Sequence, residues 1–282
     1  MNSVANIDTE FEAAVPVIIV GGGACGLVAA LTLADAGIDS LVLERDALPS
    51  GSTALSSGMI PACATHLQRT AGVKDSVEML IHDIQAKAKG QADPAVVRAV
   101  AEVSGPTVEW LITDHGIELT LVDGFLYPGF SALRMHAPLS RQGADLMSGL
   151  LRAAEAARFD IVTNALVTDL VALNDGRVIG VTVQRPDGST EKIGCQALIL
   201  ACNGYGGNPD MVREHIPEMA TAEYFGHPGN QGDAVQWGAS LGAAVKHMGA
   251  YQGHGSVAVP HGILITWALM MEGGIQVNCF GE

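Results

Sequence analysis

A glycine-rich turn near the amino terminus has the residue spacing of a dinucleotide-binding site. The apolar run 17–20 leads into Gly21, Gly23 and Gly26, and an alanine-rich stretch follows them. In a strand–turn–helix unit this G-x-G-x-x-G pattern permits a tight turn and lets the backbone approach a pyrophosphate, while the helix start supplies free N–H groups. We therefore predict dinucleotide binding here. A glycine-rich turn that holds no ligand is the alternative.

A carboxylate and a loop of small residues extend the predicted site. The run 41–43 is typical of a second strand, and it ends in Glu44, eighteen residues after Gly26. An acidic side chain in this place accepts a hydrogen bond from a ribose hydroxyl of the dinucleotide. The loop 49–58 consists mostly of small residues, so a planar ring can approach its backbone closely.

Composition narrows the class of protein. The 282 residues include 15 basic and 30 acidic side chains, and this net charge of −15 disfavours nucleic acid or an anionic membrane surface as the main partner. The polar segment 1–12 lacks the features of a signal peptide, and the apolar run 262–271 is too short to span a bilayer. Five cysteines without C-x-x-C spacing argue against a zinc or iron–sulfur site. They fit a reducing compartment, so we expect a cytoplasmic protein without a metal.

Hydrophobic periodicity and turn residues predict a mixed α/β chain. Apolar residues recur at helical spacing between 75 and 89, and Asp93 followed by Pro94 predicts the start of a further helix. Asn174-Asp175-Gly176 favours a hairpin between two strands. The predicted elements are a first helix ended by Gly37, two or three helices up to His115, a helix over 143–157, strands over 161–173 and 178–184, a turn at 186–188, and a strand over 197–201 that leads into a second glycine-rich passage.

Together these features resemble the flavin-binding domain of two-dinucleotide-binding flavoproteins. The segments 229–234, 251–254, 265–266 and 273–278 resemble, in order and spacing, the soluble branch of the fumarate reductase and succinate dehydrogenase flavoprotein superfamily. The resemblance runs over nearly the whole chain from about residue 14. It implies an α/β fold with a Rossmann-like FAD-binding domain and β-meander over 14–250. The start of a substrate or capping domain follows over 251–282, where the family pattern is apparently cut short.

The cofactor that the resemblance implies is FAD. Membrane-bound relatives attach it through a histidine in the loop after the acidic strand, and Ser52 stands at that place here, so we expect FAD to be held non-covalently. The cofactor-binding residues that the motifs and the resemblance indicate are Gly21, Gly23, Ala24, Gly26, Glu44, Arg45, Ser52, Thr53, Ser57, Gly58, Val167, Ala201, Asn203, Gly204 and Asp233.

The resemblance also implies a set of substrate-side residues. His254, supported by Gln252, donates a hydrogen bond to a substrate carboxylate or carbonyl, and Thr266 binds a carboxylate oxygen. Arg134 and His136 match an Arg-x-His pair near the flavin, with a solvent-facing loop as the alternative. Where fumarate-reducing relatives have a proton-carrying glutamate, this chain has Trp267, which disfavours fumarate itself as the substrate.

The implied activity is that of an FAD-dependent oxidoreductase. It acts on a carbon–carbon bond next to a carboxylate or ketone, by hydride transfer with the flavin N5 atom. The expected partners are a small-molecule substrate and an external electron donor or acceptor, because the sequence has no haem motif or cysteine cluster. Two alternatives stay open: a ketosteroid-type dehydrogenase of the same superfamily, and a catalytically incomplete FAD-binding fragment.

Overall fold

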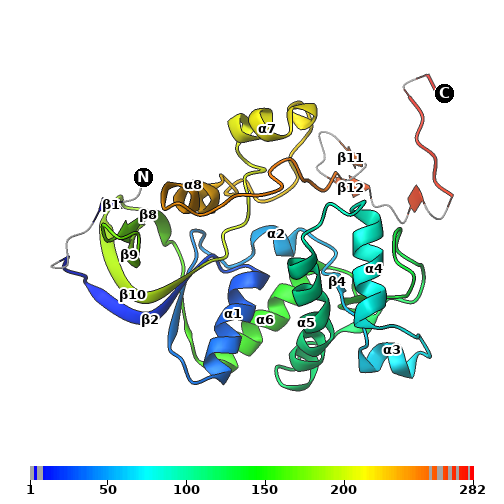
Figure 1. Ribbon diagram of the computed structural model, residues 1–282, viewed down its shortest axis with the longest axis horizontal. Helices are drawn as coiled ribbons and strands as arrows, with labels where there is room; N and C mark the ends of the chain where they lie inside the picture. Colours follow the sequence, from blue (N-terminus) through cyan, green and yellow to red (C-terminus); the bar gives the residue numbers. More distant parts are fainter. Residues whose placement is uncertain are drawn as a thin grey trace. The chain divides into compact units, whose positions relative to one another are not determined.

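The computed structural model (Figure 1) describes residues 3–4, 9–253, 256–258, 263–265, 269–270, 273–278 and 280–282. The chain divides into two compact units, Met1–Cys202 and Asn203–Glu282, and each is described by itself. The boundary near residue 250 that the sequence suggests stays a prediction. None of the helices in the described ranges is both long enough and apolar enough to cross a membrane.

A seven-stranded sheet organises the first unit, in the order β1-β8-β9-β10-β2-β3-β7. Four adjacent strands, β10, β2, β3 and β7, pair in parallel, and β1 pairs in parallel with β8. The strand bounds are β1 (Ser3–Val4), β2 (Ala13–Val20), β3 (Ser40–Leu43), β7 (Asp160–Val162), β8 (Leu166–Ala172), β9 (Val178–Gln184) and β10 (Thr190–Leu200).

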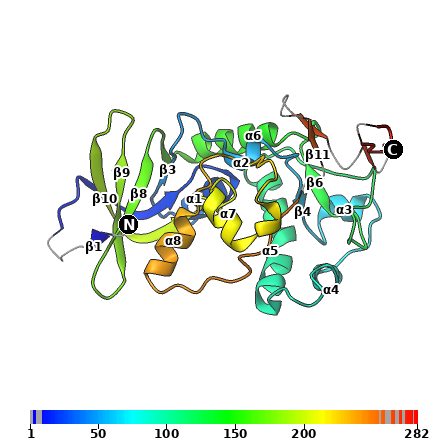
Figure 2. The ribbon, with the colours of Figure 1, turned by 90° about the horizontal axis from the view of Figure 1, so that it is seen from above.

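Strand β10 pairs with two neighbouring strands, one antiparallel and one parallel. Its first residues pair antiparallel with β9, and from Ile193 onwards it pairs parallel with β2. The predicted strand 197–201 is therefore only the last part of an 11-residue strand. Figure 2 shows β8, β9 and β10 side by side as a meander. The hairpin prediction at 174–176 is confirmed, because β8 and β9 pair antiparallel across it.

One predicted strand is wrong in its extent. The apolar residues of 161–173 form two strands, β7 and β8, with a break over 163–165. β7 pairs parallel with β3, whereas β8 pairs antiparallel with β9. Asn164 lies in the break with a positive φ of 52°, and its N–H donates to the carbonyl of Asp46. The apolar pattern gives no sign of this change of partner.

Helix α1 packs on the sheet, and α5 and α6 pack against α1. In Figure 1 α1, α6 and α5 lie side by side. One face of α1 packs Ala30 against β2 and β3, and its other face packs Leu27 and Leu31 against α5 and α6. The helices are α1 (Ala24–Asp35), α2 (Gly51–Ala54), α3 (His66–Thr70), α4 (Val77–Lys87), α5 (Pro94–Thr113) and α6 (Gly143–Ala157).

Side-chain caps define the starts of α3, α4 and α5. The Asp93 side chain accepts hydrogen bonds from the first turn of α5, with Pro94 at the first helical position. α6 spans the predicted range, and two helices, α4 and α5, fill the stretch between 75 and 115. The predicted loop 49–58 contains the short helix α2. A small antiparallel sheet of β4 (Ile60–Pro61), β6 (Met135–Ala137) and β5 (Thr120–Leu121) lies in the order β4-β6-β5.

The second unit contains short elements joined by glycine-rich turns. They are α7 (Pro209–His215), the 3₁₀ helix η1 (Pro217–Met219), α8 (Asp233–Ser240), and the antiparallel pair β11 (Ser256–Ala258) and β12 (Ile263–Ile265). Residues 273–278, which resemble a strand of the superfamily, have no regular structure here.

Candidate functional site

Two glycines of the predicted turn are required by the fold itself. Gly21 has a φ of 108°, and a Cβ atom there would lie 2.6 Å from the carbonyl oxygen of Ala201. A Cβ atom on Gly26 would overlap the carbonyl oxygen of Gly21. The side-chain-free surface lets α1 begin directly against the ends of β2 and β10.

Gly23 is different, because the protein alone leaves room for a side chain there. The nearest atom to a Cβ on Gly23 would be the Thr53 hydroxyl oxygen, at 3.6 Å. Gly23 is also the N-cap of α1 and has an ordinary extended backbone. Gly23 adjoins the first turn of α1, where N–H groups without helical partners favour an anion. This glycine is what the close approach of a pyrophosphate requires, so the residues present fit a dinucleotide.

Glu44 is buried at the end of β3 and holds the turn in place. Its carboxylate accepts hydrogen bonds from the N–H groups of Gly22, at 2.8 Å, and Asp46, at 2.9 Å. The side chain is only 6% exposed. Each carboxylate oxygen has a second lone pair, so these two bonds leave acceptor capacity for a ribose hydroxyl. Glu44 therefore lies at the end of the strand, as predicted, and has a structural role, whereas its contact with the ribose stays a prediction.

The loop of small residues touches the glycine turn directly. The Thr53 hydroxyl oxygen accepts a hydrogen bond from the Ala24 N–H at 3.2 Å. Behind the loop, Gly143 at the start of α6 donates its N–H to the Ser56 carbonyl at 2.7 Å. A Cβ atom on Gly143 would overlap the Thr53 carbonyl oxygen. Backbone contacts on both sides thus fix Thr53 beside the start of α1.

The remaining predicted cofactor residues of the first unit lie after β10, in β8 and in the segment that follows β3. Ala201 donates its N–H to the Val20 carbonyl at 2.8 Å. Val167 is buried in β8 beside a register irregularity. Arg45 and Ser57 are exposed, Ser52 is partly buried, and Gly58 is buried with a φ of 65°. The turn, β3 and β10 thus bring Gly21, Glu44 and Ala201 to one edge of the sheet.

The other predicted residues belong to the second unit or lie outside the description. Asn203 adopts the left-handed conformation, with a φ of 61°, and its side chain donates to the Asn230 side chain. Gly204 accepts a hydrogen bond from the Gly232 N–H, next to Asp233 at the start of α8. Gln252 is exposed. His254, Thr266 and Trp267 lie outside the described residues.

Arg134 is held by two carboxylates in the interior of the first unit. Its guanidinium donates two hydrogen bonds to Asp75, at 2.7 and 2.8 Å, and one to Asp83. The Arg134 and Asp75 side chains are fully buried. Burial alone would raise the pKa of Asp83, but hydrogen bonds from Arg134 and Ser131 outweigh it and lower that pKa. The solvent-facing loop considered for Arg134 is wrong, and its contact with the flavin stays a prediction.

His136 is buried beside Arg134 and has both ring nitrogens paired. Nδ1 lies 2.9 Å from the Arg134 carbonyl and Nε2 lies 2.8 Å from the Thr65 hydroxyl. The neutral ring satisfies both contacts when Nδ1 donates and Nε2 accepts. Gln68 completes the network by donating to Asp75 and to the Leu133 carbonyl.

The sequence interpretation missed the carboxylate partners of Arg134. One signal was available: Asp83 lies three residues after Leu80, so it belongs to the apolar face of α4. A carboxylate on a buried helical stripe indicates a buried cation nearby. Asp75 gives no such signal, because it precedes the helix.

The buried state of His136 predicts a pH dependence of stability. Burial lowers the pKa of His136 below its ordinary value of 6.5, and backbone hydrogen bonds offset only part of this effect. The unfolded chain therefore takes up this proton at a higher pH than the folded chain, and the free energy of unfolding falls as the pH drops through and below 6.5. We expect this group to contribute a slope of at most about 1.4 kcal/mol per pH unit. Urea unfolding of the wild type and of His136→Asn at neutral and mildly acidic pH measures it, and equal slopes would contradict the prediction.

The geometry of the turn, the acidic strand end and the small-residue loop defines an α/β dinucleotide-binding protein. Residues 16–282 match the family described as FAD binding domain, and the chain belongs to this family. The predicted cofactor, FAD, is thereby confirmed.

Similar proteins are found among reductases and dehydrogenases. The chain is 28% identical over 270 residues to the fumarate reductase (cytochrome) of Shewanella frigidimarina, covering 95% of this chain and 47% of that protein. It is 31% identical over 207 residues to the urocanate reductase of Eggerthella lenta, covering 73% of this chain and 34% of that protein. The chain thus spans less than half the length of these two curated relatives.

Solved structures show the same fold. The open conformation of a flavocytochrome c3 fumarate reductase matches with a TM-score of 0.77 at 28% identity, over 83% of this chain and 41% of that one. A 3-ketosteroid-Δ4-(5α)-dehydrogenase from Rhodococcus jostii RHA1, in complex with 4-androstene-3,17-dione, matches with a TM-score of 0.79 at 26% identity, over 88% of this chain and 58% of that one. The predicted fold class is confirmed.

Glu44→Ala is expected to weaken FAD binding and to destabilise the fold. The Gly22 and Asp46 N–H groups lose their acceptor, which costs about 1–3 kcal/mol of unfolding free energy. Glu44→Gln keeps the shape and one carbonyl oxygen, so its losses should be smaller. Flavin absorbance after dialysis measures occupancy, and unchanged occupancy in Glu44→Ala would remove Glu44 from the cofactor site.

Proposed function

We propose that this protein is an FAD-dependent oxidoreductase that acts on a carbon–carbon bond next to a carboxylate or ketone. The observation that carries the proposal is the open backbone at Gly23 beside Thr53 and Glu44, which fits FAD. The related proteins support the substrate class. Fumarate and urocanate are unsaturated carboxylates, and a 3-ketosteroid has a ketone beside the reacting bond.

The residues of the chain have distinct proposed tasks. The glycine turn and Glu44 hold the dinucleotide, and Thr53 connects that turn to the loop proposed to face the flavin ring. When bound, the flavin exchanges a hydride with a substrate carbon. His254 and Gln252 bind and polarise the substrate carboxylate or carbonyl, and Thr266 binds a carboxylate oxygen. A donor directed at developing charge lowers the barrier.

The proposed substrate is larger or more apolar than fumarate. An indole cannot carry a proton, so Trp267 cannot replace an acid in a relay. We further propose that FAD is bound non-covalently, that an external donor or acceptor exchanges the electrons, and that the protein works in the cytoplasm. The described cysteines Cys25, Cys63 and Cys195 are free thiols, which supports the last point.

A spectroscopic experiment tests the proposal. The purified chain should show a flavin spectrum, and acid precipitation should leave FAD in solution. After anaerobic reduction, urocanate, fumarate and 4-androstene-3,17-dione are added separately, and return of the visible flavin band reports electron transfer. We expect reoxidation by an unsaturated carboxylate or ketone, and slower reoxidation in His254→Ala with unchanged FAD content.

Each outcome separates the candidate functions. Reoxidation by the steroid alone would favour the ketosteroid-type dehydrogenase, which the match to the Rhodococcus enzyme supports. A yellow protein that none of these compounds reoxidises would favour an FAD-binding fragment without turnover. An unaltered rate in His254→Ala would remove His254 from the site.

A further inference from the structure

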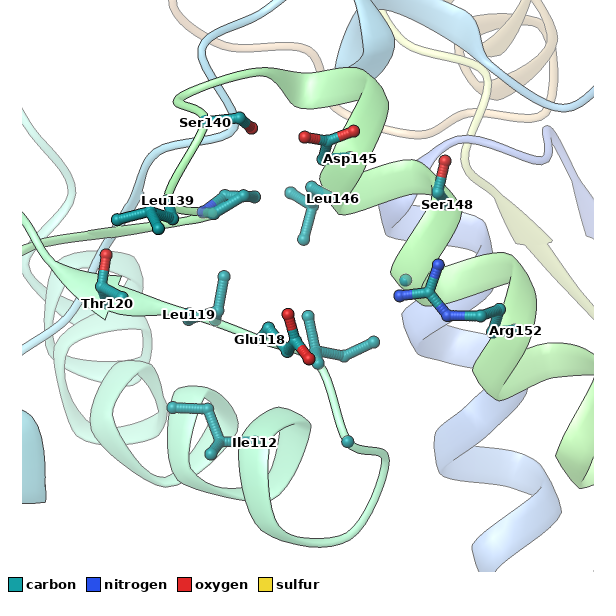
Figure 3. A pocket seen from close by; sticks show the side chains of 14 residues that line it. Ile112, Glu118, Leu119, Thr120, Leu139, Ser140, Asp145, Leu146, Ser148 and Arg152 are labelled. Carbon is teal, nitrogen blue, oxygen red and sulfur yellow. The ribbon is translucent and has the colours of Figure 1, made fainter.

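A groove of about 900 Å³ lies on the first unit, away from the glycine turn. It is bounded by the end of α5, the residues that lead into β5, the segment 138–140 and the first turns of α6 (Figure 3). Its volume is in the range of sites that bind organic ligands or peptide side chains. The described fold and the proposed function give this groove no role.

The groove combines an apolar floor with an exposed apolar side chain at its mouth. Ile112, Leu119 and Leu146 contribute the floor. Leu139 lies at the mouth and is 82% exposed, which is unusual for a leucine in a hollow surface. Leu119 and Leu146 are 7% and 4% exposed, so an occupant with one aliphatic side chain would pack on the floor and remove mainly Leu139 from water.

Three charged side chains surround the apolar floor. Glu118, Asp145 and Arg152 line the groove, and Figure 3 shows the last two projecting from α6 about two turns apart. Within the described ranges none of the three forms an ion pair. The groove thus has one carboxylate in excess, on a chain of net charge −15. This potential attracts cationic groups and repels a second copy of the same chain.

The groove also adjoins the edge of a sheet. β5 is the outer strand of the order β4-β6-β5, and residues 118–120, which lead into it, line the groove. An edge strand presents main-chain N–H and C=O groups to an added strand. The Arg152 guanidinium supplies further donors for peptide carbonyl groups.

We propose that this groove binds an extended peptide segment of a partner protein, in which one aliphatic side chain is flanked by lysine or arginine. The aliphatic side chain contacts Leu119, Leu146 and Leu139. The flanking cations pair with Glu118 and Asp145, and the main chain lies along residues 118–120. This mode uses the apolar floor, the excess negative charge and the sheet edge together.

Fluorescence anisotropy with the FAD-loaded full chain tests the proposal. The probe is a labelled, amidated peptide of sequence Gly-Lys-Leu-Lys-Gly, with Gly-Glu-Leu-Glu-Gly and Gly-Lys-Ser-Lys-Gly as comparisons. We expect saturable binding of the first peptide and about tenfold weaker binding of each comparison peptide. Equal binding of the acidic peptide would overturn the charge argument and the proposal.

Substitutions at exposed positions locate the binding. Leu139→Ser should weaken binding of the basic peptide about tenfold, and Glu118→Lys about threefold or more. Glu155→Lys, on α6 but outside the groove lining, is the matched control and should bind like the wild type. Unaltered binding in both groove variants, or absence of saturable binding, would overturn the proposal. Self-association lost in Leu139→Ser would assign the groove to a second copy instead. Circular dichroism establishes that each variant is folded.

Discussion

Gly23→Val is expected to give a folded protein that purifies without FAD. The protein itself leaves space at Gly23, where the nearest atom to a Cβ would be the Thr53 hydroxyl oxygen at 3.6 Å. A valine side chain would fill the place that the pyrophosphate approaches. Far-ultraviolet circular dichroism should therefore match the wild type, whereas the visible flavin band should be absent. A fully yellow Gly23→Val protein would contradict the assignment of this turn to the cofactor.

Gly26→Val is the matched comparison, and it should fail at an earlier stage. Its Cβ atom would overlap the Gly21 carbonyl oxygen, which is backbone and cannot move away alone. Forcing atoms into a packed contact of this kind costs about 1–3 kcal/mol or more. We expect lower thermal stability or insoluble protein together with FAD loss. The contrast between the two variants distinguishes a glycine needed for the ligand from one needed for the fold.

Arg134→Met should lower the free energy of unfolding by about 3–5 kcal/mol, because it leaves two carboxylates without their cation. Asp75 is fully buried and Asp83 nearly so, and both depend on the Arg134 guanidinium. Urea unfolding of the apoprotein measures the loss independently of FAD binding.

A combined variant separates the ion pairs from simple packing. Arg134→Met with Asp75→Asn and Asp83→Asn removes all three charges, so it should be more stable than Arg134→Met alone. If the free energy of unfolding of Arg134→Met lies within about 1 kcal/mol of that of the wild type, water or rearrangement compensates the two carboxylates.

The sequence predicts elements best where local signals define them. Helix α6 matches its predicted range, and Asp93 and Pro94 determine the start of α5. The break between β7 and β8 escapes the sequence because it depends on pairing partners, β3 and β9, that an apolar run does not reveal. The ends of these strands are therefore determined by their pairing partners in the folded protein.

The candidate site also contains residues that the sequence predicts and residues that it does not. The turn residues are predictable because the backbone of a strand–turn–helix unit places them, whatever the surrounding side chains are. The buried hydrogen-bond network of Arg134 is not predictable in this way, because its partners Asp83 and Asp75 lie 51 and 59 residues away in the chain. His254 and Thr266 stay predictions that only the proposed experiments test.

The pairing of β2 between β3 and β10 has a consequence for the order of folding. The Ala201 carbonyl packs against Gly21 in the turn, but Ala201 is synthesised 180 residues after Gly21. Contacts between such distant segments form late, because closing a long loop costs entropy before it is rewarded. A nascent chain that ends before β10 lacks the Ala201 contact and one of the two parallel partners of β2. The turn is therefore complete for FAD only after β10 has been synthesised and has paired with β2.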